Sequence, residues 1–306
     1  MTLLDRIFAA RQSKKTGFVL ALGGGGGRGL AHLGVLEVLE EHKLRPDAII
    51  GCSIGALFGA MYAIDPDARK VITRAMDIMA HESFSKLSIP EPEGQAIEEA
   101  SWMDRLTAAA KQTMMLTRAA TDRSVSDTDA LIDIAFKVCG GESVSDAKIP
   151  LFITAVEFPN GECHLFSADS DVKLPCAIAA SMAIPGVFDP VKVAGKKYVD
   201  GGVASDFPVI EAQMVATTGQ LVVAVNVGSR PGADIEPENV YGMLDWSTQV
   251  KSFHLRKANR HHADVVIEPL VGFTQWNDFS NPQQEIDRGR QAAYEQMPSL
   301  IKKLAG

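Results

Sequence analysis

Short apolar runs alternate with longer amphipathic segments near the start of the chain. Residues 17–22 (GFVLAL) form an apolar run that stops at a cluster of glycines, as a buried strand feeding a tight loop would. In residues 29–42, apolar side chains recur at helical spacing and glutamates take the other side. Residues 47–52 (DAIIGC) then predict a second strand, and 53–64 a second helix. Because each strand leads directly into a helix, the pattern predicts a parallel sheet covered on both faces.

A further helix is predicted next, followed by a stretch of weaker periodicity. Asp65 and Pro66 suit the N-cap and the first position of that helix. Its expected buried stripe consists of Val71, Ile72, Ala75, Met76 and Met79. From residue 82 to 126 the sequence has no strand signal, and an acidic segment precedes a region that contains Trp102, Met103, Met114 and Met115. We interpret 82–126 as a helical insertion or cap, and the methionine-rich region either covers a lipid-binding groove or packs as ordinary core.

Regular patterns return near residue 126. A capped helix should begin near Ser126 or Asp127 and end at Gly140 and Gly141. Apolar runs then predict strands at 150–158, 163–168, 196–200, 221–227 and 263–269, with a long helix before the last of them and a helix at the C-terminus. We therefore expect one domain over 17–306.

Composition narrows the classes of function. The chain has 306 residues, of which 46% are hydrophobic, so it can bury a large core. Its formal charge of -8, with both signs mixed, argues against a nucleic-acid partner. No apolar run approaches the roughly 20 residues that span a bilayer. The four cysteines form no Cys-x-x-Cys pair, so we expect free thiols in a reducing, cytoplasmic compartment and no metal site.

Residues 1–16 are predicted to form an amphipathic helix. One face of this helix would be apolar and would consist of Leu3, Leu4, Ile7 and Phe8, while arginine and lysine side chains of the same segment supply positive charge. This helix either packs on its own domain or makes peripheral contact with anionic lipid at the inner face of the membrane.

The cluster Gly23 to Gly27, followed by Arg28 and Gly29, is not explained by helix or strand propensity, because consecutive glycines cost backbone entropy in regular structure. Between a strand and a helix, such glycines let successive N–H groups turn toward one anion, assisted by the helix dipole. A nucleotide phosphate, a reaction oxyanion and a plain tight turn all remain open from this motif alone. The missing Lys-Ser/Thr ending of a P-loop weakens the nucleotide interpretation.

Gly51-Cys52-Ser53-Ile54-Gly55 is a G-x-S-x-G motif between a predicted strand and a predicted helix. A nucleophile elbow needs this context, because its sharp turn holds the serine in a strained conformation and lifts the hydroxyl above the sheet. The alternative is a glycine-rich connection with a structural serine. Asp200-Gly201-Gly202 ends the strand predicted at 196–200, where the aspartate could form an Asx turn or accept a proton from a serine.

In this order, the three motifs resemble the signature of the patatin-like phospholipases: a GGGxRG oxyanion loop, a GxSxG elbow one βα unit later, and a downstream DGG. A further block at 180–191 is similar to the family's ASxAxPxxFxPV segment. The resemblance covers roughly residues 17–210. One departure is Asp206, which stands where many members have Asn before the final Pro.

The resemblance implies a patatin-like three-layer α/β/α sandwich with a mostly parallel central sheet and a helical insertion. It implies hydrolysis of acyl esters of phospholipids or related lipids through an acyl-enzyme on Ser53, with Asp200 as the base and without metal or cofactor. The implied oxyanion donors are the N–H groups of Gly24, Gly25 and Gly26, with Arg28 supporting the loop. The implied elbow and turn glycines are Gly51, Gly55, Gly201 and Gly202.

Two other interpretations compete with this one. In an ordinary α/β-hydrolase triad, Ser53 and Asp200 would be joined by His254, His261 or His262, but Ser53 follows only the second predicted strand, which is early for that fold. His32 is expected to pack or to start a helix. A nucleotide-binding or regulatory module would use the glycine loop without hydrolysis, and the elbow motif argues against it.

Overall fold

The computed structural model describes residues 17–79, 128–231, 237, 240–271 and 278–305. The predicted N-terminal helix at 1–16 and the predicted insertion at 82–126, with its methionine-rich region, lie outside these residues.

One eight-stranded sheet forms the centre of the described fold, in the order β5-β6-β3-β2-β1-β7-β8, and β4 pairs with β3 outside this path. The bounds are β1 (Gly17–Leu22), β2 (Ala48–Cys52), β3 (Leu151–Phe158), β4 (Cys163–Phe166), β5 (Val191–Val193), β6 (Lys196–Asp200), β7 (Gln220–Val225) and β8 (Val265–Ile267). Strands β3, β2, β1, β7 and β8 run parallel, whereas β4, β5 and β6 join by antiparallel pairing. The prediction of a mostly parallel sheet is confirmed.

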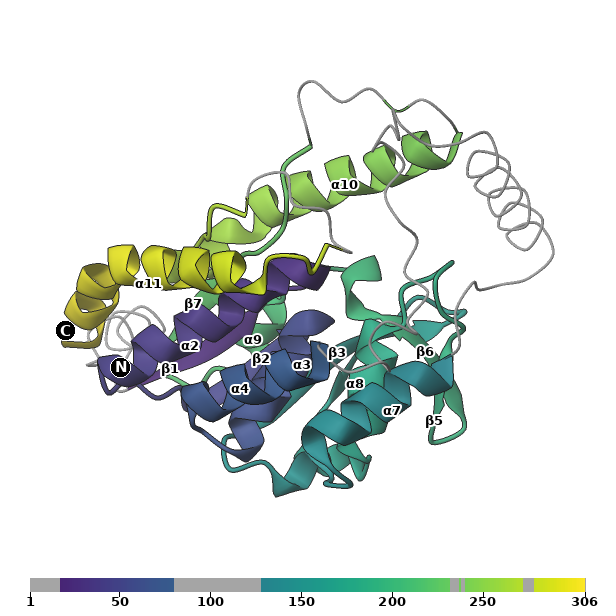
Figure 1. The fold of residues 1–306 in the computed structure, drawn as a ribbon, viewed down its shortest axis with the longest axis horizontal. Helices are drawn as coiled ribbons and strands as arrows, with labels where there is room; N and C mark the ends of the chain where they lie inside the picture. Colours follow the sequence, from purple (N-terminus) through teal and green to yellow (C-terminus); the bar gives the residue numbers. More distant parts are fainter. Residues whose placement is uncertain (1–16, 80–127, 232–236, 238–239, 272–277, 306) are drawn as a thin grey trace, which may run out of the picture.

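Helices pack on both faces of the sheet, although unequally (Figure 1). The larger core lies against α2 (Ala31–Glu41), α3 (Ile54–Ile64), α4 (Ala68–Met79), α7 (Thr128–Cys139), α8 (Leu174–Met182) and α11 (Pro282–Ala305). A smaller core on the other face lies under α9 (Val209–Val215). The long helix α10 (Val240–Asn259) follows β7. Short 3-10 turns are η1 (Gly26–Leu30), η2 (Val144–Asp146), η3 (Ala168–Ser170), η4 (Gly201–Val203) and η5 (Arg260–His262).

The central strands are apolar on both faces because both faces are covered. In β1, Leu20 and Leu22 enter the larger core, while Val19 and Ala21 enter the smaller one. This alternation follows from the two-residue period of a strand. The two cores thus confirm the predicted three-layer sandwich.

The start of α4 differs from its prediction. Asp65 does not cap this helix, because its N–H donates to Met61 O at 3.2 Å and so ends α3. Pro66 also precedes the first helical turn. The capping contact comes instead from Asp67, whose Oδ1 accepts the Lys70 N–H at 3.1 Å. The two polar residues flank a proline in one short connection, so the sequence pattern could not decide between them.

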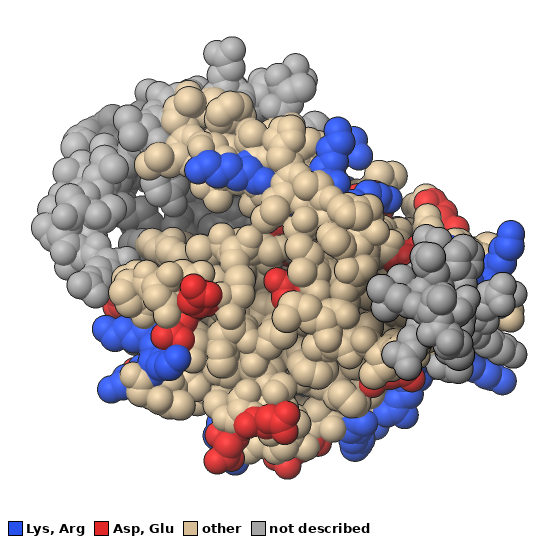
Figure 2. Space-filling view, turned by 180° about the vertical axis from the view of Figure 1, so that it is seen from behind, with Lys and Arg blue, Asp and Glu red and all other residues tan. Residues whose placement is uncertain are grey.

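The face seen in Figure 2 carries scattered charge. Lys and Arg side chains lie around its rim among Asp and Glu, with broad uncharged areas between them, and the described residues form no continuous basic patch on this face. None of the described helices has both the length and the apolar character that crossing a membrane requires.

Helices α2 and α11 approach each other closely through glycine. A Cβ at Gly289 would lie 1.9 Å from Ala31 O, and a Cβ at Gly34 would lie 2.0 Å from Ile286 O. Each glycine therefore allows the backbone of the partner helix to occupy the space of a side chain.

We expect Gly289→Ala to lower the free energy of unfolding by about 1–3 kcal/mol, because the added methyl group forces these helices apart. Denaturant unfolding measures the effect. Gly141→Ala is the matched control, since its added Cβ would lie 3.6 Å from the Phe136 ring, an ordinary contact. Equal stability of the two variants would contradict the prediction.

Candidate active site

Ser53 sits in a sharp turn between β2 and α3. Its φ of 54° and ψ of -121° are strained for a residue with a side chain. The flanking glycines permit this turn, because a Cβ at Gly51 would lie 2.5 Å from Ala56 Cα and a Cβ at Gly55 would lie 2.3 Å from Leu22 O. The geometry is that of a nucleophile elbow, with the hydroxyl at the N-terminus of α3.

The elbow is held from α8 by a residue to which the sequence analysis assigned no role. The Ser53 N–H donates to Ser181 Oγ at 2.9 Å, and Ser181 is fully buried. Ser181 belongs to the 180–191 block, so the motif located it, but only the packing of α8 against α3 shows what the hydroxyl does. The bond satisfies a donor that the strained turn would leave unpaired.

Each carboxylate oxygen of Asp200 accepts a short hydrogen bond, and the Cys52 thiol lies 4.0 Å from Oδ1. Oδ1 accepts the Gly202 N–H at 2.7 Å, which forms the Asx turn considered above, and Oδ2 accepts the Ser53 hydroxyl at 2.7 Å. A Cβ at Gly201 would lie 2.3 Å from Thr154 Oγ1, so this turn fits tightly against β3. The structural and the chemical interpretation of the aspartate are therefore compatible.

Ser53 and Asp200 come from two strands, β2 and β6, that both pair with β3. Strand β2 is parallel to β3 and pairs with its residues 151–154, whereas β6 is antiparallel and pairs with residues 155–158 on the same side, because β4 occupies the other side. The turn after β2 and the end of β6 therefore meet beside the middle of β3. Alternating strand direction is invisible in the motif order, so this placement required the tertiary structure.

Burial controls the electrostatics of Asp200. Loss of solvation raises the pKa of its carboxyl group to about 6, against the lowering effect of the hydrogen bonds from Ser53 and Gly202. The negative charge of Asp206 raises the pKa further. Burial also raises the pKa of the adjacent Cys52 thiol, which keeps this neighbour neutral. A carboxylate with such a pKa can accept a proton near neutral pH.

The glycine loop lies directly against the elbow. A Cβ at Gly24 would lie 3.4 Å from Ser53 Cβ. The Gly24 N–H, however, donates to Asp206 O at 2.8 Å, so in this structure it is committed to the protein and the expectation that it faces an oxyanion is corrected. Gly26 lines one cavity together with Ser53. Arg28 folds back on the loop, and its Nε donates to Gly25 O at 3.1 Å.

An apolar cavity of about 800 Å³, counting the open space at its mouth, begins at Ser53 and Gly26. Its lining comes from α3, α4, α7, α8 and the segments around Ile184 and Phe279. Along α3 the cavity follows Ile54, Leu57, Phe58 and Met61. A long apolar group attached to a reacting carbonyl at Ser53 would find matching surroundings here.

No histidine among the described residues hydrogen-bonds to Ser53 or Asp200. His254 is exposed on α10, His261 Nδ1 contacts Ala258 O at 2.7 Å, and His262 Nδ1 contacts Gln213 Oε1 at 2.9 Å. His32 is buried, and its Nε2 lies 2.8 Å from Gly23 O. Burial lowers the pKa of His32 to about 4, so the neutral ring donates this bond and supports the glycine loop.

The described residues also contain no group of three or more His, Cys, Asp or Glu side chains placed to hold a metal ion.

We expect Ser181→Ala to destabilise the fold by about 1–3 kcal/mol, because the Ser53 N–H would remain buried without an acceptor. Chemical denaturation measures this change. The exposed Ser299→Ala serves as the control for loss of a serine hydroxyl. If both variants unfolded at the same denaturant concentration, the bond to Ser181 would be unimportant for the elbow.

Comparisons with known proteins identify the family of this chain. A family model described as patatin-like phospholipase matches residues 20–212. Lysophospholipase NTE1 of Debaryomyces hansenii is 28% identical over 210 residues, which is 69% of this chain and 12% of that protein. Patatin-like phospholipase domain-containing protein 6 of Mus musculus is 27% identical over 248 residues, 76% of this chain and 16% of that protein. An uncharacterised NTE family protein of Mycobacterium tuberculosis is 28% identical, covering 74% of this chain and 54% of its own length.

Solved structures show the same fold at low identity. Human GIVD cytosolic phospholipase A2 aligns with a TM-score of 0.53 and 10% identity, over 97% of this chain and 62% of that one. VipD from Legionella pneumophila aligns with a TM-score of 0.51 and 16% identity, over 94% of this chain and 67% of that one. The family model covers more than half of the chain and includes the glycine loop, the elbow and the Asp200 turn. The chain therefore belongs to the patatin-like phospholipase family.

Proposed function

We propose that this chain is a serine acyl hydrolase that cleaves carboxylic ester bonds of phospholipids or related lipids, with Ser53 as the nucleophile and Asp200 as its base. The observation that carries the proposal is the 2.7 Å hydrogen bond from Ser53 Oγ to Asp200 Oδ2 in a strained elbow at the mouth of an apolar cavity. Such a distance is what transfer of the hydroxyl proton requires.

The proposed reaction has two halves. Asp200 takes the proton of Ser53 as Oγ attacks the ester carbonyl carbon, and the resulting oxyanion is stabilised by the N–H groups of Gly25 and Gly26 and by the positive end of the α3 dipole. The tetrahedral intermediate expels the alcohol, which receives the proton from Asp200, and leaves an acyl group on Ser53. Water then attacks this ester while Asp200 accepts its proton. The second tetrahedral intermediate collapses, Ser53 Oγ takes the proton back from Asp200, and the free acid leaves.

The lipid class of the substrate is supported by two observations. The cavity at Ser53 is lined by aliphatic, aromatic and thioether side chains, including Met61, Met79 and Met182, which adapt to a flexible chain. Two of the relatives are named as a lysophospholipase and a phospholipase domain-containing protein. The chain spans only 12% to 16% of the length of those two relatives, so their activity enters here as part of the proposal.

The competing interpretations lack comparable support. A triad needs a histidine beside the dyad, and His254, His261 and His262 contact other groups or solvent. A nucleotide module would need the glycine loop free for phosphate, yet the loop packs against the elbow. The cytoplasmic location and the peripheral membrane contact remain predictions.

The dyad is tested by substitution. Ser53→Ala should abolish hydrolysis of a soluble ester such as p-nitrophenyl butyrate and the covalent labelling of the protein by a fluorophosphonate. Asp200→Asn should lower kcat by about 10⁴-fold, because the amide keeps the shape but cannot take the proton. His254→Ala and His261→Ala are the controls and should keep wild-type rates. If either histidine variant were folded and as inactive as Ser53→Ala, a triad would replace the dyad.

The proposal also fixes a direction for the pH dependence. Only the ionised form of Asp200 accepts a proton, and its pKa is raised to about 6, so kcat/KM should fall as the pH decreases through about 6. Steady-state rates between about pH 4.5 and 8, corrected with Ser53→Ala as the blank, measure this limb. An acidic limb at the ordinary aspartate pKa of about 4 would show that burial does not control the base.

A further inference from the structure

Asp206 occupies a position that connects the parts of the candidate site. Its main-chain oxygen accepts the Gly24 N–H at 2.8 Å. A Cβ at Gly24 and a Cβ at Gly202 would each lie 3.6 Å from Asp206 Cβ. The residue is therefore wedged between the glycine loop and the turn that holds Asp200.

The carboxylate of Asp206 is partly buried and pairs with a cation from an element that is distant in the sequence. Its Oδ2 forms an ion pair with Arg256 Nη1 on α10, and the side chains are only 7% exposed for Arg256 and 19% for Asp206. Placing a carboxylate here without this partner would leave a charge in a poorly solvated site. The pairing explains how this chain tolerates Asp where the family pattern described above often has Asn.

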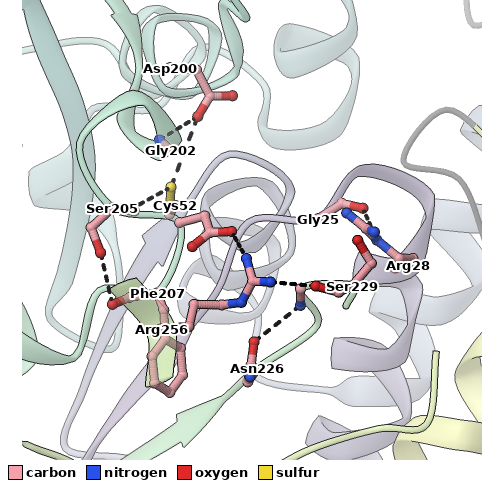
Figure 3. A network of polar contacts seen from close by, with 12 residues as sticks. Gly25, Arg28, Cys52, Asp200, Gly202, Ser205, Phe207, Asn226, Ser229 and Arg256 are labelled. Carbon is pink, nitrogen blue, oxygen red and sulfur yellow. Dashed lines mark hydrogen bonds and ion pairs between the residues drawn. The ribbon is translucent and has the colours of Figure 1, made fainter. Parts of the chain in front are cut away.

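Arg256 is itself fixed by further contacts (Figure 3). Its Nη2 donates to Ser229 O, and a Cβ at Gly228 would lie 2.3 Å from the guanidinium carbon. The Gly228 N–H in turn donates to Asn226 Oδ1 at 3.1 Å. The ion pair with Asp206, the bond to Ser229 O and the close packing of Gly228 hold the planar guanidinium group of Arg256 in one orientation. A surface arginine without such contacts would be flexible.

The glycine loop meets this network at a second point. Arg28 Nε donates to Gly25 O, as Figure 3 also shows. The side chain of Arg28 is partly buried near Arg256, Asp206 and Glu285, and loss of solvation together with the repulsion from Arg256 lowers its pKa to about 10. Asp206 thus lies between two cations that reach it from η1 and α10.

We infer that Arg256 is a positioning residue for the acyl transfer: through Asp206 it fixes the glycine loop against the Asp200 turn, so that the oxyanion donors and the dyad keep one relative placement. The inference rests on the proposed function. Arg256 is not among the residues that line the cavity at Ser53, and its contacts are with Asp206 and with the loop after β7.

The charges around Asp200 and Asp206 provide a second measurable quantity, the pKa of Asp200. Asp200 faces Ser53 and the neutral Cys52 thiol of β2, and Asp206 lies in the segment after η4. The carboxylate of Asp206 faces two cations, Arg28 of η1 and Arg256 of α10. On the other face of the sheet, the negative charge of Glu211 in α9 contributes to the raised pKa of the Cys52 thiol. Because the charge of Asp206 raises the pKa of Asp200, removing that charge should lower it.

The test compares Arg256→Gln, Asp206→Asn, the double variant and the control Arg69→Gln. Arg69 is an exposed arginine at the start of α4 and takes part in none of the contacts described above. Rates are measured with p-nitrophenyl butyrate at a temperature where thermal unfolding shows each protein to be folded. Arg256→Gln should lower kcat by up to about 100-fold with little change in KM, because the catalytic groups lose their alignment. Arg69→Gln should match the wild type.

Asp206→Asn should keep most of kcat, because Asn still accepts from Arg256, and should move the acidic limb of kcat/KM to lower pH. Adding Asp206→Asn to Arg256→Gln should recover most of the lost kcat, because no unpaired carboxylate remains. If Arg256→Gln does not fold, the double variant decides by comparison with Asp206→Asn. An unchanged kcat in Arg256→Gln, an unshifted limb in Asp206→Asn or a double variant without recovery would each overturn the inference. A wild-type protein that neither hydrolyses the ester nor is labelled at Ser53 would instead refute the proposed function.

Discussion

The hydrogen bond between Ser53 and Asp200 is the constraint on which the arrangement of this molecule depends. It joins two groups that are 147 residues apart, and both sit at the ends of strands in one sheet. Serine and aspartate have short side chains, so the 2.7 Å distance between the hydroxyl and the carboxylate depends on where the two backbones are placed. The sheet provides this rigidity, because the two strands that carry the pair both hydrogen-bond to β3.

Holding that bond requires backbone conformations that most residues would not tolerate. Ser53 adopts a positive φ, and the glycines beside it let α3 and β1 approach where side chains would collide. The Ser181 hydroxyl satisfies the N–H that this turn exposes inside the protein. The strained backbone at Ser53 is thus held by contacts that take no direct part in the proposed chemistry.

Burial supplies the other half of the arrangement. Burial raises the pKa of Asp200 into a range where the carboxyl group can exchange protons near neutral pH. A second carboxylate, that of Asp206, lies close to Asp200 in the same poorly solvated region. The cation of Arg256 offsets that second charge and ties α10 to the site. The same low polarity continues into the apolar cavity, where it favours an acyl chain over water.

The sequence by itself determined the strand and helix order, the elbow motif at Ser53 and the glycine loop, whereas the role of Asp200 was implied only by the resemblance of the ordered motifs to a family. These features are local, because apolar periodicity and glycine spacing reflect backbone geometry over a few residues. It could not determine the antiparallel insertion of β6, the use of the Gly24 N–H by Asp206, or the cap of α4 at Asp67. Nor did it indicate the roles of Ser181 and Arg256, because these arise from contacts across 128 and 50 residues. Only the tertiary structure decides such pairings, because a motif records which residues are present and not which neighbours the folded chain gives them.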